Sequence, residues 1–302
     1  MKKLTYTRSW SKIVLTFLAI MFCLINGNKA VAQLKPANAI YYFNEFLINP
    51  SIAGREEVLK ASIGYRQQLS SFNGAPQNQF LAVDYGFDSK SGIGLKINND
   101  KAGLLRQTSI SATYAYHLPL NELDRLSFGI SASFTNDRLN ESIINGDPND
   151  PDVADVNQRK AYVDSDFGMT YKGKALTIQA VFPNMVATIK NSRSTEANYA
   201  LFFSSVSYSV ETDLGLVEPK VVFRGIKGFK NIVDVGTNFQ FKSTTKNQFN
   251  IMGLYHSSKN ATVGFGINFN DRYAFNGSYT MATTQLQGYS TGDFEIGLGL
   301  KL

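Results

Sequence analysis

Hydrophobic and polar residues alternate along most of the chain after residue 57. In the last run, Phe294, Ile296, Leu298 and Leu300 alternate with polar or small residues. Successive side chains of a strand point to opposite faces, so this run predicts a strand with one apolar face and one polar or small face. Similar runs occupy residues 58–68, 78–87, 91–98, 108–118, 125–136, 162–172, 174–182, 197–210, 217–226, 231–242, 248–257, 260–269, 272–281 and 292–302.

The length of these runs points to a membrane. Most are close to the 9–11 residues with which a tilted strand crosses a bilayer. Two runs fit less well, because Phe202 and Phe203 point to opposite faces in one and Pro219 interrupts the other. Long helical periodicity is missing from the sequence. The pattern predicts an all-β fold, a transmembrane antiparallel β-barrel of about 14 strands that spans residues 58–302.

The segments between the runs differ in length on the two sides of the predicted barrel. One side has short segments at 88–90, 119–124, 173, 211–216, 243–247 and 270–271. The other side has longer ones at 69–77, 99–107, 137–161, 183–196 and 282–291, with two short members besides. Outer-membrane barrels have short periplasmic turns and longer external loops. We therefore expect the short side to face the periplasm.

A soluble two-sheet sandwich is the structural alternative, because its strands also alternate. Its outward face is expected to be polar, however, and its loops have no preferred side. The non-hydrophobic positions here are largely Gly, Ser and Asn with isolated charges. Such residues are too small and polar for a sandwich core and suit a wet lumen, which favours the barrel.

Residues 1–32 have the pattern of a secretory signal peptide. Lys2, Lys3, Arg8 and Lys12 precede a mostly apolar run over 13–25 that is too short to cross a bilayer. The sequence Ala-Val-Ala at 30–32 offers a cleavage site between Ala32 and Gln33. A retained N-terminal anchor is the alternative.

Charge and cysteine content change meaning once this leader is set aside. The net charge of +6 includes five leader cations, so 25 basic residues remain against 24 acidic ones. The balance gives no reason to expect a nucleic-acid partner. The single cysteine, Cys23, also lies in the leader. The mature chain therefore offers no disulfide, no thiolate metal ligand and no thiol nucleophile.

The segment between leader and first strand, residues 33–57, contains the sequence FLINPSIAG at 46–54. Asn49-Pro50 can continue neither a helix nor a strand ladder, and the apolar residues around it need shelter. We expect this segment to fold into or across the periplasmic end of the barrel as a latch or partial plug. A plain N-terminal cap is the alternative.

Few residues are candidates for chemistry. His117 and His256 each lie close to the end of a predicted strand, and either can serve a membrane-embedded hydrolase if a Ser and an orienting group meet it. Neither lies near a nucleophile motif, so no catalytic residue is assigned and no enzymatic activity is expected. No cofactor site is expected either, because no Gly-rich phosphate loop or Cys/His metal cluster occurs.

An acidic segment offers the one candidate metal site. Four carboxylates occur within nine residues, those of Asp147, Asp150, Asp152 and Asp155. Calcium prefers oxygen ligands, but the spacing departs from an EF-hand and two prolines restrict wrapping. A solvated loop is the expectation, with weak calcium binding as the alternative.

Four pieces of sequence follow one another in the first part of the chain: Tyr42-Phe43-Asn44, the 47–54 stretch, Gly64-Tyr65-Arg66-Gln67-Gln68 and Phe72-Asn73-Gly74-Ala75-Pro76-Gln77. In this order and spacing they resemble the start of the PorP/SprF family of type IX secretion system outer-membrane proteins of Bacteroidetes. The similarity continues through the acidic loop and the Glu295 strand. The motif residues are Asn44, Asn49, Pro50, Ala53, Gly54, Tyr65, Arg66, Gly74, Ala75 and Pro76.

The resemblance implies an outer-membrane barrel that works with secretion machinery and is embedded in outer-membrane lipid. Family members act with the periplasmic part of that machinery or with a large secreted adhesin in export, surface anchoring and gliding motility. The expected partners are therefore type IX secretion components and a secreted surface protein. A general porin for small solutes is the alternative function, because the predicted lumen face is rich in Gly and Ser.

Overall fold

The computed structural model describes residues 39–68, 74–139, 161–189, 200–226, 230–282 and 292–302. All of them belong to the compact unit Gln33–Leu302. The predicted signal peptide, with its expected cleavage site at Ala32 and Gln33, lies outside the described residues. So do the four aspartates of the acidic segment, and both expectations remain predictions.

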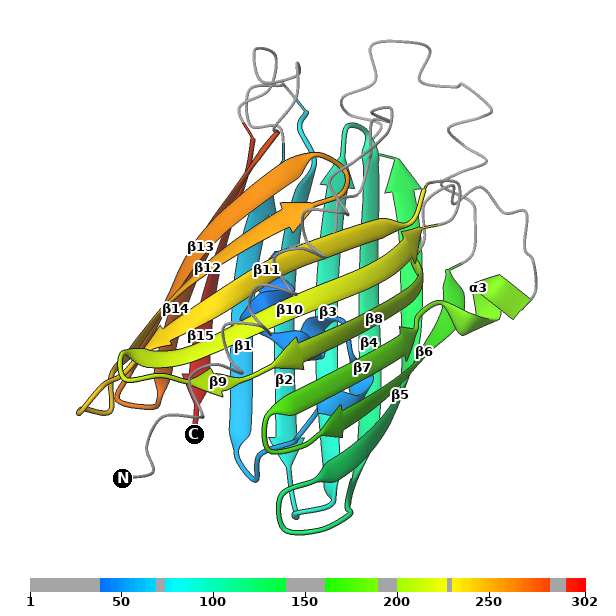
Figure 1. Cartoon of the computed structure of the whole chain (residues 1–302). Coiled ribbons are helices and arrows are strands. Elements are labelled where there is room, and N and C mark those ends of the chain that lie inside the picture. The colour runs from blue at the N-terminus through cyan, green and yellow to red at the C-terminus, as the bar shows by residue number, and fades with distance from the viewer. Residues whose placement is uncertain (1–38, 69–73, 140–160, 190–199, 227–229, 283–291) are drawn as a thin grey trace, which may run out of the picture. The chain divides into compact units, whose positions relative to one another are not determined.

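The unit is a closed antiparallel barrel (Figure 1). Its strands are β1 (Leu59–Gln67), β2 (Gln77–Gly86), β3 (Ser91–Ala102), β4 (Leu105–Pro119), β5 (Arg125–Leu139), β6 (Tyr162–Lys172), β7 (Leu176–Phe182), β8 (Ala200–Tyr208), β9 (Val210–Glu211), β10 (Gly215–Ile226), β11 (Ile232–Phe241), β12 (Gln248–His256), β13 (Asn260–Phe269), β14 (Tyr273–Ala282) and β15 (Asp293–Lys301). Consecutive strands pair with each other, except that β8 and β9 both pair with β10, and β1 also pairs with β15. Because β8 and β9 follow one course beside β10, the barrel has 14 strands, as the alternation predicted.

The outward face of the barrel is apolar. Ile63, Ile130, Phe134, Val263 and Leu298 each expose about half or more of their surface. On the same strands, the alternate residues face the lumen and are mostly buried or half-buried. A continuous apolar outer wall on a closed barrel is the surface that lipid requires. In the parts of the chain that the structure describes, no helix is long and apolar enough to cross a membrane.

The two ends of the barrel are named here by their connections. The turn end holds the connections β2–β3, β4–β5, β6–β7, β9–β10, β11–β12 and β13–β14, and the loop end holds the connections β1–β2, β3–β4, β5–β6, β7–β8, β10–β11, β12–β13 and β14–β15. One expected loop, 99–107, is wrong: β3 and β4 continue through it and meet at Gly103-Leu104, where Gly103 has a φ of +58°. The polar residues misled the prediction, because Asn98 and Asp100 are paired with Asn78 inside the barrel.

Two further details refine the predicted strands. The segment 183–196, expected as a loop, includes the short helix α3 (Met185–Ile189), whose Val186 N–H donates to the Asp164 carboxylate. The ladder beside β10 is interrupted between β8 and β9, where Tyr208 and Ser209 lie opposite Pro219 and Glu218, and Pro219 has no N–H to donate. The strands β8 and β10 correspond to the runs 197–210 and 217–226, which fitted the alternation least well.

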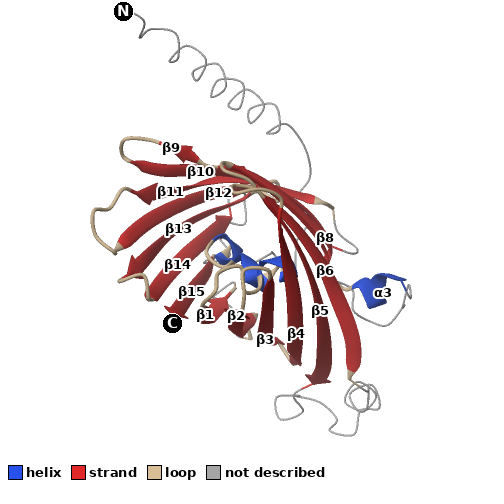
Figure 2. Cartoon of the chain, turned by 90° about the horizontal axis from the view of Figure 1, so that it is seen from below, coloured by secondary structure: helices blue, strands red, loops and turns tan. Residues whose placement is uncertain are grey.

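Inside the barrel lie three short 3-10 helices, η1 (Ile40–Tyr42), η2 (Glu45–Leu47) and η3 (Pro50–Ile52). Figure 2 shows these helices within the ring of strands. We call residues 39–54 the inner segment. The buried apolar clusters of the barrel form around it: Phe46, Ile52 and Ala53 pack on Ala82 and Ala115, and a second cluster surrounds Tyr41. The core of this protein is therefore the contact between the inner segment and the lumen wall.

Candidate functional site: the inner segment and the lumen

The lumen wall carries glycines where the inner segment approaches it most closely. A Cβ atom at Gly129 would collide with the backbone of Pro50 and Ser51, and one at Gly168 with the Asn49 side chain. Other wall glycines that would meet the inner segment are Gly86, Gly92, Gly94, Gly266 and Gly297. The Gly-rich face that suggested an open porin is thus the seat of this segment.

The fold of the inner segment depends on two asparagines. Asn44 caps η2, where its side chain accepts a hydrogen bond from the Phe46 N–H, and it donates to Ser62 at 2.8 Å. Asn49 caps η3 through Ser51, with Pro50 at the first helical position. Asn-Pro therefore starts a helix here.

Asn49 is fully buried and uses its whole side-chain amide. The amide nitrogen donates to Thr170 and to Gln179, both at 2.9 Å. The amide oxygen accepts from the backbone N–H of Ser51 at 3.0 Å and from its hydroxyl at 2.7 Å. Such complete pairing is what a buried polar group requires, and it ties η3 to β6 and β7.

The beginning of the inner segment is held by a buried carboxylate of β15. Glu295 accepts hydrogen bonds from the backbone N–H groups of Ala39 at 3.1 Å and Ile40 at 2.8 Å. Arg66 of β1 forms ion pairs with Glu295 at 3.1 Å and with Asp293 at 2.9 Å. The motif residue Arg66 therefore supports the carboxylate that holds the inner segment.

A second buried charge cluster lies beside Tyr41. Asp234 forms an ion pair with Arg224 at 2.7 Å, lies 2.7 Å from His256 Nδ1 and accepts a hydrogen bond from the Tyr41 hydroxyl at 3.4 Å. The Tyr41 ring also packs edge-on against Phe203, with 5.6 Å between ring centroids. Phe203 faces the lumen for this contact, which explains the irregular alternation in β8.

Glu45 forms the third polar attachment. Its carboxylate contacts the Lys220 ammonium at 2.9 Å, accepts a hydrogen bond from Gln179 at 2.8 Å and lies 3.5 Å from Arg55. Burial alone would raise the pKa of Glu45, but the Lys220 and Arg55 charges and these hydrogen bonds lower the pKa to about 2. Glu45 is therefore ionised and paired at neutral pH.

The end of the inner segment is attached near the turn end. The Gly54 N–H donates to Asp84 at 2.9 Å, and Gly54 adopts a φ of +62° against the backbone of Tyr85 and Gly92. His117 Nε2 lies 3.0 Å from the Ala53 carbonyl oxygen, so this nitrogen donates. The inner segment thus runs from the loop-end part of β11 and β15 to the turn end of β2 and β3. It reaches deeper than the barrel mouth expected from sequence, because its polar anchors lie along the lumen.

The remaining motif residues lie around β1 and β2. Tyr65 faces outward and donates to Gln67 at 3.1 Å, and Ala75 is buried. Gly74 has a φ of +76°, and its carbonyl accepts from the Gly103 N–H at 3.1 Å. The Pro76 carbonyl accepts from Gln68 at 2.9 Å. This second group of motif residues shapes the barrel wall near the loop end.

The two histidines are lumen residues with structural partners. His117 also lies 2.9 Å from the Ser127 hydroxyl, and His256 Nε2 lies 2.8 Å from the Thr262 hydroxyl. Asp234, His256 and Thr262 have the order of a hydrolase relay, but Thr262 is only 1 % exposed and its hydroxyl is shared with Thr280 at 2.7 Å. A nucleophile needs access to substrate, and this hydroxyl has none. Within the described residues, no group of His, Cys, Asp and Glu is arranged to hold a metal ion.

Comparison with known proteins identifies the family. The profile described as "Type IX secretion system membrane protein PorP/SprF" matches residues 30–300. The chain belongs to this family. No curated protein matches it. Similar solved structures include the KdgM porin, with 9 % identity, a TM-score of 0.38 and coverage of 80 % of this chain and 99 % of the porin. The TodX monoaromatic hydrocarbon channel deltaS2 mutant has 7 % identity, a TM-score of 0.48 and coverage of 84 % and 91 %.

Family and fold together place the chain as an outer-membrane barrel of a secretion system. The sequence pointed to the N-terminal motif and Arg66, but it marked Glu295 only as part of the strand to which the family resemblance extends. It had missed Glu45, Lys220, Arg224 and Asp234 as anchors. In the sequence, Lys220, Arg224 and Asp234 stand out only as charged residues at lumen-facing positions of predicted strands. The alternation does not show which groups they contact inside the barrel.

Proposed function

We propose that this protein is a non-enzymatic outer-membrane scaffold of type IX secretion with a filled lumen. It assists the export or surface anchoring of a secreted partner, such as a large adhesin, or links the outer membrane to periplasmic machinery. Family membership supports the secretion context. The observation that carries the scaffold role is the inner segment, buried along the lumen and attached by three sets of charged groups.

A general porin would need a lumen through which water and solute pass. Here Phe46 and Ala53 are buried against the wall, and wall glycines admit the backbone of the inner segment. Desolvated charges that have well-placed partners are costly to separate, so the inner segment is expected to stay in place. This favours a scaffold over a diffusion channel.

The catalytic alternative has less support. Both histidines use their ring nitrogens for wall or inner-segment contacts. A hydrolase would lose its activity in His117→Ala or His256→Ala, and detection of an activity in the wild type that these changes abolish would favour the enzyme.

The secretory role is tested by deleting the gene and comparing the secreted and surface-attached proteins by quantitative mass spectrometry. We expect one or a few large surface proteins to be lost from the cell surface and restored by the wild-type gene. An unchanged surface and secreted proteome would refute the proposal. Affinity purification of the tagged barrel from outer membranes then identifies the partner.

A further inference from the structure

The outer wall of the barrel changes character in layers toward the loop end of β2 to β5. An apolar layer contains Leu81, Ile97, Ile110 and Phe134, which are paired across the four strands. The next outward layer toward the loop end is neutral and polar, formed by Gln79, Asn99, Thr108 and Asn136. The layer after that contains Gln77 and three cations, Lys101, Arg106 and Arg138.

The three cations form a direct cross-strand row. Lys101 of β3 is paired with Arg106 of β4, which is paired with Arg138 of β5. Like charges directly opposite each other on one face of a sheet destabilise the pairing. Within the described part of the chain, none of the three forms an ion pair or a side-chain hydrogen bond. Nearby Asp100 and Asp137 face the lumen side, where they pair with Asn78, Asn98 and Gln107.

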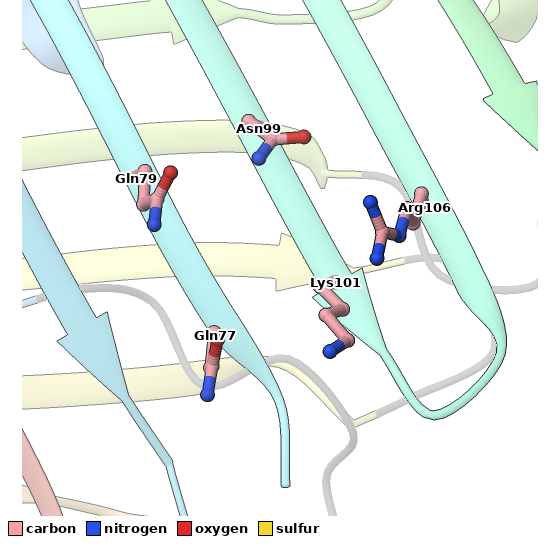
Figure 3. A pocket seen from close by; sticks show the side chains of 5 residues that line it. All are labelled: Gln77, Gln79, Asn99, Lys101 and Arg106. Atoms are coloured by element: carbon pink, nitrogen blue, oxygen red, sulfur yellow. The ribbon is translucent and has the colours of Figure 1, made fainter. Parts of the chain in front are cut away.

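Two of these cations line a cavity on the same outer face. Gln77, Gln79, Asn99, Lys101 and Arg106 surround a volume of about 260 Å³ (Figure 3). The lining combines two positive charges with side-chain amides that donate hydrogen bonds, and it contains no carboxylate. Guanidinium, ammonium and amide donors on one side of a cavity are the groups that bind phosphate oxygens.

The position of the cavity decides between sources of phosphate. It lies two residue steps beyond the apolar layer, at the border where hydrocarbon gives way to headgroups. We propose that Lys101, Arg106 and Arg138 bind the phosphate groups of a phosphorylated lipid of the outer leaflet, of the lipid A class, which holds the barrel at a fixed depth. The lipid phosphates neutralise the row of cations, and the amides of Gln77, Gln79 and Asn99 complete the hydrogen bonds.

The test uses the full barrel folded in a neutral detergent and fluorescent diphosphoryl lipid A as the probe. The variant Lys101→Gln/Arg106→Gln/Arg138→Gln removes the row. The matched control, Lys90→Gln/Lys242→Gln/Lys246→Gln, removes three exposed cations from turns at the other end. Heat-dependent gel mobility verifies that each variant is folded before binding is measured.

Each cation near an anionic membrane surface contributes roughly a fivefold change in affinity, so the row variant should bind lipid A about 100-fold more weakly. The control should change by about twofold at most, and dephosphorylated lipid A should bind the wild type as weakly as the variant binds lipid A. Equal binding by wild type and row variant would overturn the proposal. Inorganic phosphate that displaces lipid A at equal concentration would assign the site to a soluble anion instead. Loss of a protein partner with unchanged lipid binding would assign it to protein docking.

Discussion

Gly129 offers the sharpest perturbation of the contact between wall and inner segment. In Gly129→Ala the new methyl group points at the backbone of Pro50 and Ser51, which cannot rotate away as a side chain would. Overpacking of a well-packed site costs about 1–3 kcal/mol. Because the outward face and the strand ladder are unchanged, we expect this cost to fall on attachment of the inner segment.

The matched control is Gly253→Ala. Gly253 is also inside a strand, but a Cβ there meets no atom within 4 Å. Removing glycine from a strand is expected to be neutral or slightly stabilising when the new side chain fits. Any effect of Gly129→Ala beyond that of Gly253→Ala therefore reports contact with the inner segment.

The assay follows the labelling of a single thiol. Ser51 is buried, and Ser51→Cys changes one atom of its side chain. In a Cys23→Ser background this thiol is unique, because Cys23 is the only cysteine of the sequence. When opening and closing are fast, the labelling rate follows the population of the detached state.

A cost of 1–3 kcal/mol predicts that Gly129→Ala increases the labelling rate by about 5- to 150-fold. Gly253→Ala should label at the rate of the wild type. Equal rates in the two alanine variants would refute the claim that wall glycines seat the inner segment.

Further predictions concern the polar anchors. Asn49→Ala should lower the free energy of unfolding by about 3 kcal/mol, against about 1 kcal/mol for Asn44→Ala. The reason is that the fully buried Asn49 side chain makes more hydrogen bonds than that of Asn44. Urea unfolding in detergent measures both changes. Because the folded pKa of Glu45 is depressed to about 2, its stabilisation is present above its ordinary pKa of 4.5 and is lost as pH falls toward 2. Pepsin should therefore cleave the inner segment faster as the pH falls from 4.5 toward 2. Lys220→Met should move this increase in cleavage rate to higher pH, and a pH profile that this variant leaves unchanged would contradict the Glu45–Lys220 ion pair. Arg224→Ala should destabilise the barrel by about 3–5 kcal/mol, since it leaves a buried carboxylate with one partner fewer. Unchanged thermal unfolding would refute this.

The strands were predictable because a membrane imposes a simple rule on them. One face meets lipid and the other does not, so residues such as those from Phe294 to Leu302 alternate regularly. The rule fails where polar residues continue a strand beyond the lipid. Residues 99–107 resembled a loop, but β3 and β4 extend there, and Asp100 has partners inside the barrel in Asn78 and Asn98.

The inner segment was predictable only in part. Its apolar residues and Asn-Pro step required shelter, and the family motif marked it. Its path depends on contacts between residues far apart in sequence, such as Ala39 with Glu295 and Tyr41 with Asp234. Nor does alternation reveal that Gly129 makes room for the backbone of the inner segment and Gly168 for the Asn49 and Pro50 side chains. In the sequence, a lumen-facing glycine beside such a segment has the same pattern as one beside water.

The most direct test of a filled lumen is the single-channel conductance of the wild-type barrel reconstituted in a planar bilayer. A scaffold whose inner segment remains attached predicts no steady open-channel current at neutral pH. A steady, voltage-independent conductance typical of a diffusion porin would contradict the account.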